Sequence, residues 1–254
     1  MTWDWEPSII LGCVALAAGY LYFAHGRTAL QTCSFLGGIV VLLLDLVSPI
    51  DTLADTYLFS AHVLQHFVLA LVVPPLWLLG IPGSAAERVL QRRRVDGIEQ
   101  ALSRPGVSWA AGVGTMLAWH IPALFSAAIA NDGLHILQHL SFLVSGAIFW
   151  WPVLAPVEPR RLAPLAAVVY LFGACTACSL LGAALTFTRP GWYPAYLNPT
   201  GDAGTLRLIR TGWGLDARTD QQFGGLLMWV PGCLVYLSAI LARVAAWYRA
   251  PEPA

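Results

Sequence analysis

Residues 59–81, FSAHVLQHFVLALVVPPLWLLGI, combine the two features that decide the fold. The stretch is apolar from Phe67 onward, and it is long enough to cross the hydrocarbon core of a bilayer, which requires about 20 mostly apolar residues. Two histidines, His62 and His66, stand one helical turn apart near its start. The stretch therefore predicts a membrane-spanning helix with a polar end that is able to bind a metal ion.

The composition of the whole chain also indicates a membrane protein. Of its 254 residues, 57% are hydrophobic and 11% are charged, and the mean hydropathy is +0.66. Soluble domains carry about 25% charged residues. Fourteen acidic residues balance fourteen arginines, because the chain has no lysine, and this zero net charge excludes a highly charged nucleic-acid binder. Five cysteines are an odd number in a chain too apolar to need disulfides, so a secreted cysteine-rich domain is excluded.

Apolar segments of similar length recur along the chain. We predict one all-α integral membrane domain over residues 1–254 with seven transmembrane helices. The predicted spans lie near residues 8–24, 30–47, 59–81, 107–130, 134–154, 162–187 and 223–247. Of the two long loops, residues 82–106 are expected to form a short amphipathic surface helix, and residues 188–222 a structured cap or a surface that docks a partner. The acidic N-terminal segment lacks the positive region of a signal peptide, so the first span is expected to be retained.

The arginines indicate how these helices are oriented. With the N-terminus outside, ten of the fourteen arginines fall in inner segments, five of them in the loop of residues 82–106. Positive charge collects on the cytoplasmic side of membrane proteins. The acids Asp51, Asp55 and Asp132 fall in outer turns. The sequence therefore predicts that the N-terminus lies outside and the C-terminus inside.

The histidine motif occurs twice, at an offset of 73 residues. The matching elements are Pro49 and Pro122, His62-Val63-Leu64-Gln65-His66 and His135-Ile136-Leu137-Gln138-His139, and Trp77 and Trp150. Both copies cover an outward-going helix, an outer turn and an inward-going helix. We therefore predict that helices 2–3 and 4–5 form a parallel internal repeat, and membrane folds built in this way place binding sites at the repeat interface.

Helix geometry gives the repeated motif its chemistry. Residues four apart lie on one face of a helix, so each copy presents two imidazoles side by side, an arrangement that can bind a metal ion. Both pairs fall at the outer end of inward-going helices, and a further histidine lies near the outer end of the fourth span. The predicted metal ligands are His62, His66, His120, His135 and His139.

Other side chains near this end are additional candidates. Gln65 and Gln138 lie beside the histidines and could orient an imidazole. Met116, one turn from His120 on the same helix face, has a thioether that would suit Cu(I), and Met228 is expected from the seventh span. Asp45 is an acid inside the second span, where ionisable groups are commonly functional. The simpler interpretations also stay open: Met116 can be a core residue, and Asp45 can pair with a neighbour.

The cysteines form a second, weaker pattern. Cys175 and Cys178 share a face of the sixth span, and Cys233 lies at a similar depth on the seventh. Three thiols could hold or relay a soft cation. Buried cysteine is also common simply as a small apolar residue. The seventh span could further supply Gln221 or Gln222 to the site.

Segments spread over nearly the whole chain carry a family resemblance. They comprise residues 58–66, 74–76, 80–82, 149–152 and 220–229. With these motifs the chain resembles the CtaG-type cytochrome c oxidase assembly factors. The resemblance implies a multi-pass protein of the bacterial cytoplasmic (inner) membrane that matures haem-copper oxidase by handling copper. It also implies oxidase subunits and a periplasmic copper donor as partners.

Several functions remain open at this point. An all-histidine site favours Cu(II) or zinc as readily as Cu(I). Histidines from two helices could instead be axial ligands of a b-type haem in a redox protein. A copper transporter is a third candidate, which the cysteine layer alone supports. An enzyme is the class we least expect, because the chain shows neither a nucleotide-binding glycine fingerprint nor a nucleophile placed beside a base.

Overall fold

The computed structural model describes residues 3–249, so the predicted domain of residues 1–254 extends beyond the described part at both ends. The main helices, in chain order, are α1 (Pro7–Phe23), α2 (Ala29–Val47), α3 (Pro49–Thr56), α4 (Phe59–Phe67), α5 (Val73–Gly80), α6 (Gly83–Leu90), α7 (Arg93–Leu102), α8 (Pro105–Trp119), α9 (Pro122–Ile129), α10 (Asp132–Leu154), α11 (Pro164–Phe187), α12 (Pro194–Leu197), α13 (Ala203–Arg207) and α14 (Ala217–Arg249). A π-helical turn, Val68–Val72, joins α4 to α5 without a break. No strand occurs within residues 3–249, so the all-α prediction is confirmed there.

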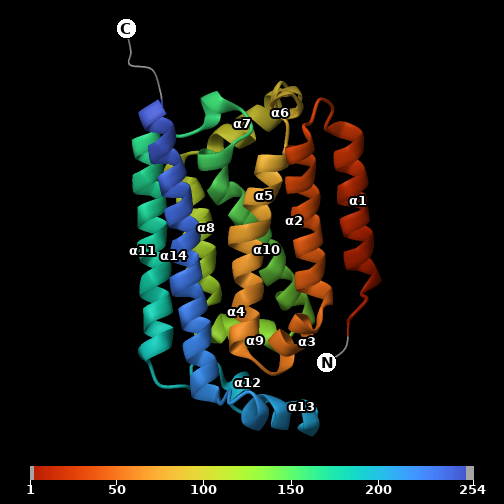
Figure 1. Cartoon of the computed structure of the whole chain (residues 1–254), viewed down its shortest axis with the longest axis vertical. Coiled ribbons are helices and arrows are strands. Elements are labelled where there is room, and N and C mark those ends of the chain that lie inside the picture. Colours follow the sequence, from red (N-terminus) through yellow and green to blue (C-terminus); the bar gives the residue numbers. More distant parts are fainter. Residues whose placement is uncertain (1–2, 250–254) are drawn as a thin grey trace.

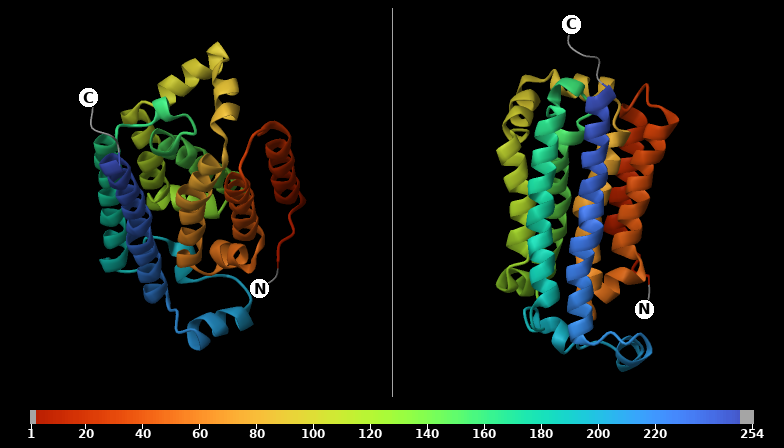
Figure 2. Two further views of the ribbon diagram at one scale, coloured as in Figure 1. Left: turned by 45° about the horizontal axis from the view of Figure 1, so that its top comes forward. Right: turned by 60° about the vertical axis from the view of Figure 1, so that its left-hand side comes forward.

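The long helices form an upright bundle with different caps at its two ends (Figure 1). The helices α1 and α2 lie on one side, and the paired helices α11 and α14 lie on the other. At one end, the short helices α3 and α9 lie near the start of α4, with α12 and α13 below them. At the opposite end, α6 and α7 lie across the bundle (Figures 1 and 2). The two ends therefore differ in architecture.

Five helical stretches are long and apolar enough to cross a membrane: α2, α4 with α5, α10, α11 and α14. They confirm five of the predicted spans and make the chain a multi-pass membrane protein. The helix α1 is apolar but shorter, with 17 residues. The total of seven spans stays a prediction, as does their orientation.

The fourth predicted span, residues 107–130, is wrong as a continuous helix. The helix α8 ends at Trp119, α9 begins at Pro122, and the two are bent by 74°. Ile121 between them has an extended backbone, with φ −64° and ψ 123°, because the residue before a proline is disfavoured in the helical region. His120 therefore lies at a break between two helices.

The two copies of the repeated motif have the same order of elements. Each begins with an eight-residue helix that starts at a proline, Pro49 in α3 and Pro122 in α9. Each short helix is followed by a long helical stretch with the histidines in its first two turns. This order agrees with the repeat, which stays a prediction.

The two long loops are both folded. Residues 82–106 form two short helices, α6 and α7, where one was expected. Residues 188–222 contain α12 and α13 and bury Tyr193 and Tyr196 against the bundle. The Tyr196 hydroxyl donates to the carbonyl oxygen of Ala54 in α3 at 2.6 Å. The loop of residues 188–222 is therefore a structured cap, as predicted.

The helices α11 and α14 pack with their backbones in contact. A Cβ atom at Gly182 would lie 2.8 Å from the carbonyl oxygen of Gly225, and one at Gly225 would lie 2.6 Å from that of Gly182. Small residues allow such close approach between membrane helices. This contact fixes the position of α14, whose first turns reach the end of the bundle where the histidines lie.

We expect Gly182→Ala to lower the free energy of unfolding by about 1–3 kcal/mol, because the new methyl group overpacks the backbone of α14. The matched control is Gly114→Ala in α8, where an added Cβ meets nothing within 4 Å. Thermal unfolding of the full chain in detergent measures both variants. Equal midpoints for the two would contradict the proposed backbone contact.

Candidate metal centre

A carboxylate from α14 holds the first turn of α4. Asp220 Oδ2 accepts a hydrogen bond from the backbone N–H of Phe59 at 2.8 Å. Its Oδ1 accepts from the N–H of Ser60 at 3.0 Å and from the Ser60 hydroxyl at 2.6 Å. The first N–H groups of a helix have no partner within the helix, and a negative charge there is favourable. Asp220 therefore positions the turn that carries His62, a role that the sequence did not predict.

The start of α10 is fixed by a local cap. The side chain of Asn131 accepts from the backbone N–H of Leu134 at 2.9 Å. His135 and His139 follow in the first two turns, as His62 and His66 do in α4. Both motifs therefore begin at the same end of the bundle.

The two motifs bring four imidazoles together. Within the motifs, the ring centroids of His62 and His66 are 4.3 Å apart, and those of His135 and His139 are 4.2 Å apart. Between the motifs, His62 lies 5.2 Å from His135, and His66 lies 5.8 Å from His139. His120, at the break between α8 and α9, is 5.9 Å from His66. The structure thus places all five predicted ligands in one group, which we call the histidine cluster.

Several ring nitrogens of this cluster are buried without a partner. His62, His66 and His120 are buried, and within the described chain both nitrogens of His66 find no hydrogen-bond partner. The same holds for Nε2 of His120, His135 and His139. A buried polar atom left unpaired is unfavourable by about 1–3 kcal/mol, so these rings suit a bound group.

Three of the rings are placed to share one ion. The ligand nitrogens of His62, His66 and His139 all lie within 4.8 Å of one another, and we call this set the buried site. Nitrogens bound to one metal ion at about 2.0–2.1 Å lie no more than about 4 Å apart. Small ring rotations would therefore complete a three-histidine site.

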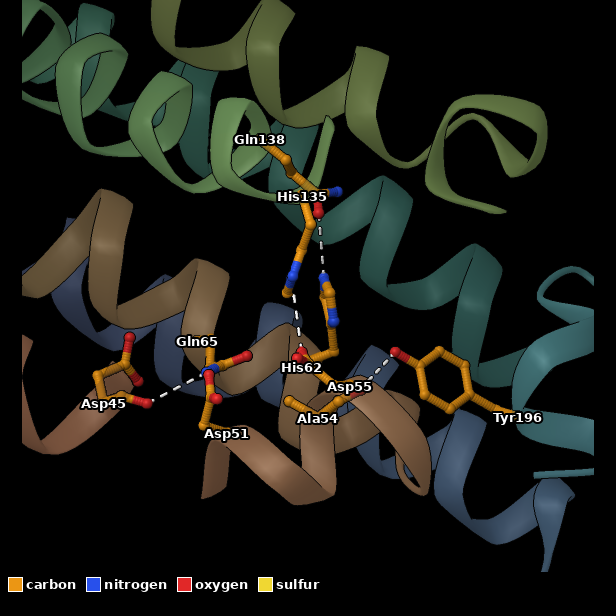
Figure 3. Close-up of polar contacts among 9 residues, drawn as sticks. All are labelled: Asp45, Asp51, Ala54, Asp55, His62, Gln65, His135, Gln138 and Tyr196. Atoms are coloured by element: carbon orange, nitrogen blue, oxygen red, sulfur yellow. Dashed lines mark hydrogen bonds and ion pairs between the residues drawn. The ribbon is translucent and has the colours of Figure 1, made fainter. Parts of the chain in front are cut away.

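The two glutamines of the motifs have different partners (Figure 3). Gln138 Oε1 lies 3.3 Å from Nε2 of His62, so it can orient this imidazole, as its place in the motif predicts. The amide of Gln65 donates instead to Asp51 Oδ1 at 2.9 Å and to the backbone oxygen of Asp45 at 3.1 Å. Gln65 therefore ties α4 to α2 and α3.

An acidic residue of α3 reaches the edge of the cluster. Asp55 Oδ1 lies 3.6 Å from Nε2 of His135 (Figure 3). The ligand atoms of Asp55, His62 and His135 also lie within 4.8 Å of one another, and we call this set the mouth site. Burial, together with the charges of Asp132 and Asp4, raises the pKa of Asp55 to about 6. A bound cation would relieve this repulsion.

Two other acids near the mouth site, Asp51 and Asp45, are not among its members. Burial and the charge of Asp55 raise the pKa of Asp51 to about 6, although the hydrogen bond from Gln65 opposes the shift. Asp45, which the sequence suggested as a ligand, is buried, but it belongs to neither the mouth site nor the buried site. Asp55 was missed because it lies in an apparent outer turn, where acids are common.

A comparison with protein families assigns the chain. A model described as cytochrome c oxidase caa3 assembly factor matches residues 11–250. The chain belongs to this family. The resemblance found in its motifs is thereby confirmed over nearly the whole length.

The individual relatives that match the chain share a low sequence identity with it. An uncharacterized protein of Mycobacterium leprae is 26% identical over 271 residues, which cover 96% of this chain and 40% of the relative. Uncharacterized proteins of Mycobacterium bovis and Mycobacterium tuberculosis are each 25% identical over 273 residues, covering 97% of this chain and 39% of their own length. The chain thus spans well under half of these relatives. No solved structure matches it.

In this member of the caa3 assembly factor family, sulfur-containing side chains share a cavity with two of the histidines. A cavity of about 50 Å³ is lined by His66 and His120 together with Met116, Met228 and Cys178. The thioethers predicted from the fourth and seventh spans therefore share a cavity with the histidine cluster. Soft donors of this kind favour Cu(I).

The other two predicted thiols lie outside this cavity. The sulfur atoms of Cys175 and Cys233 are 3.0 Å apart, and the Cys178 thiol donates to the backbone oxygen of Met228 at 3.2 Å. Within residues 3–249, the three cysteines do not form a set whose ligand atoms all lie within 4.8 Å. Gln221, a further candidate, donates to the carbonyl oxygen of Leu185 at 3.0 Å.

We expect Asp220→Asn to destabilise this family member by about 1–3 kcal/mol, because a carboxamide has one acceptor oxygen and leaves a buried donor of α4 unpaired. Asp202→Asn is the control, since Asp202 caps the exposed start of α13 and should change stability by no more than about 0.5 kcal/mol. Thermal unfolding in detergent measures both. An unfolding midpoint as high in Asp220→Asn as in the control would show that the cap does not hold α4.

Proposed function

We propose that the chain binds copper at the histidine cluster, on the periplasmic face of the bacterial inner membrane, and assists insertion of the copper into haem-copper cytochrome c oxidase. The observation that carries this proposal is the buried site. It combines three imidazoles with ring nitrogens in reach of one ion, and within the described chain each of these rings has a buried nitrogen without a hydrogen-bond partner. Family membership supplies the connection with the oxidase.

The proposed location depends on the orientation of the bundle. The helices α6, which contains Arg88, and α7, which begins with Arg93 and Arg94, lie at the end opposite the histidine cluster (Figure 1). Positive segments stay in the cytoplasm, so the histidine cluster would face the periplasm. This arrangement fits seven spans with the N-terminus outside, and it puts the cluster at the interface of the proposed repeat.

The cavity volume and the side chains near the histidine cluster suit copper better than haem or zinc. Pockets for larger ligands enclose roughly 300–1,000 Å³, so the cavity of about 50 Å³ beneath the histidines has no room for a haem. Imidazoles suit zinc and copper alike, but the thioethers of Met116 and Met228 favour Cu(I). Copper is here the cargo, and its handling requires no catalytic turnover by the chain. The proposed partners are oxidase subunits and a periplasmic copper donor.

Copper transport across the bilayer is the second candidate. One observation favours it: Cys178 lines the same cavity as His66, so soft donors continue below the histidine cluster. Transport would require that copper pass this thiol. Uptake that persists in Cys178→Ser, together with lost copper in the purified oxidase of His66→Ala cells, would support the assembly role.

We expect the purified full chain to bind copper stoichiometrically and His66→Ala to bind it far more weakly. The loss should exceed the roughly 10–100-fold that follows removal of a group supporting a metal ligand, because His66 is itself a proposed ligand. Competition with the Cu(I)–bicinchoninate complex, followed by absorbance, measures the affinity.

The matched control is His25→Ala, because His25 is exposed and lies beyond the far end of α1. It should bind copper as the wild type does. An absorption spectrum of the same preparation tests for haem through a Soret band. Copper affinity that is unchanged in His66→Ala, or a wild type that binds none, would refute the proposed function.

A further inference from the structure

We infer that copper reaches the buried site by way of the mouth site, with His62 shared between the two. This inference rests on the proposed function. The mouth site consists of Asp55, His62 and His135, and the buried site consists of His62, His66 and His139. Because both sets contain His62, an ion can pass from one to the other while it remains bound to this imidazole.

The exposure of the side chains gives the path a direction. The side chain of Asp55 is 42% exposed and that of His135 is 16% exposed. His62 is 0% exposed and His66 is 3% exposed. His139 is half-buried, as His135 is. A cation from the aqueous phase therefore meets the carboxylate of Asp55 first, and His62 and His66 last.

Neighbouring contacts hold the parts of this path in place. Tyr196 of the cap donates to the carbonyl oxygen of Ala54, next to Asp55, and so fixes the end of α3. Gln138 is within hydrogen-bond distance of Nε2 of His62 (Figure 3). The shared ring thus has one nitrogen held by an amide, which must yield when that nitrogen binds the ion.

The transfer is a ligand exchange without electron transfer. The ion loses its bonds to Asp55 and His135, keeps one to His62, and gains bonds to His66 and His139. The charge of Asp55 also attracts cations toward the mouth site, and such steering accelerates association by about 10–1,000-fold in favourable cases. The carboxylate therefore acts on the rate of loading more than on the final affinity.

The test compares loading rates in the purified full chain. Stopped-flow absorbance follows copper leaving the Cu(I)–bicinchoninate complex for wild type, Asp55→Asn and Asp4→Asn. Asp4→Asn is the matched control, because it removes an exposed acid close enough to act on Asp55 but outside both sites. We expect loading of Asp55→Asn to slow by about tenfold or more, with its equilibrium affinity nearly unchanged.

Each outcome separates this inference from the proposed function. A wild type without copper binding refutes the proposed function itself. Asp55→Asn that loads as rapidly as wild type refutes the mouth site, and so does an equal slowing in Asp4→Asn, because the effect would then be general charge. Loss of equilibrium affinity in Asp55→Asn would make Asp55 a ligand of the final site and overturn the two-step path.

The opposite end of the bundle carries a second, independent site. A cavity of about 960 Å³ opens between α1, α2, α5, α6, α7 and α10. Apolar side chains such as Phe23, Ile98 and Ile148 line most of it, and Arg88 and Arg92 contribute positive charge. The third charged group of the lining, Glu99, pairs with Arg160 at 3.0 Å. The geometry points to a site for a phospholipid with an anionic headgroup.

The charges and shape fit this occupant. The apolar lining suits acyl chains, and basic pockets between membrane helices on the cytoplasmic side bind anionic headgroups. Arg88 also donates to the carbonyl oxygen of Phe23 at 3.1 Å, which ties α6 to α1 across the opening. A lipid seated here would connect α1 and α2 with the surface helices α6 and α7.

Native mass spectrometry of the full chain with added phosphatidylglycerol or phosphatidylcholine tests this site. We expect preferential retention of phosphatidylglycerol, reduced about tenfold in Arg88→Gln/Arg92→Gln. Arg93→Gln/Arg94→Gln is the control, because these arginines are exposed neighbours outside the cavity lining. Ala147→Trp, which fills the cavity without changing charge, should reduce retention of both lipids.

The lipid site is refuted if the two lipids are retained equally by the wild type. It is also refuted if the control pair loses phosphatidylglycerol as strongly as Arg88→Gln/Arg92→Gln does, because surface charge alone would then explain the binding. Undiminished retention in Ala147→Trp would place the lipid outside the cavity.

Discussion

Polar groups need partners in the apolar interior of a membrane bundle, and this constraint organises the end of the molecule where the histidines lie. Asp220 accepts three hydrogen bonds from the start of α4, including those of the Phe59 and Ser60 N–H groups. Gln138 pairs with His62. Within the described chain, by contrast, buried nitrogens of all three rings of the buried site, His62, His66 and His139, have no hydrogen-bond partner. A cation bound between these rings would offset the unfavourable free energy of burying the nitrogens without hydrogen-bond partners.

Helix breaks gather the candidate ligands at that end. A straight bundle would leave the histidines of α4 and α10 open to the aqueous phase. The prolines Pro49 and Pro122 instead begin short helices, which cover the ends of the spans. The same breaks put His120 between α8 and α9 and bring Asp55 of α3 beside His135. The spans thus supply rigid support, and the irregular connections complete the site.

The sequence predicted the parts that depend on local periodicity. Hydropathy alone identified stretches such as 59–81, and the spacing of four residues identified the histidine pairs. The sequence could not predict Asp220 as a cap, because its contact with Ser60 joins residues 160 positions apart. In addition, α14 begins before its apolar stretch, so Asp220 did not belong to the predicted span. The bend at His120 was missed because residues 107–130 are mostly apolar and long enough for one span, although Pro122 carried the signal. Asp55 escaped notice because only the fold shows which outer acid meets a histidine.

If the histidine cluster binds a metal ion as proposed, the order of donor types would give a selectivity that no single site would have. From the surface inward, the donors change from the carboxylate of Asp55 to imidazoles and then to the thioethers of Met116 and Met228. Calcium and magnesium prefer several oxygen ligands, so a single carboxylate among imidazoles holds them poorly. Zinc suits the imidazoles but gains little from thioethers, whereas Cu(I) gains at each step. If copper is the cargo, the chain would select it by the sequence of environments, because each deeper set of donors favours it further over its competitors.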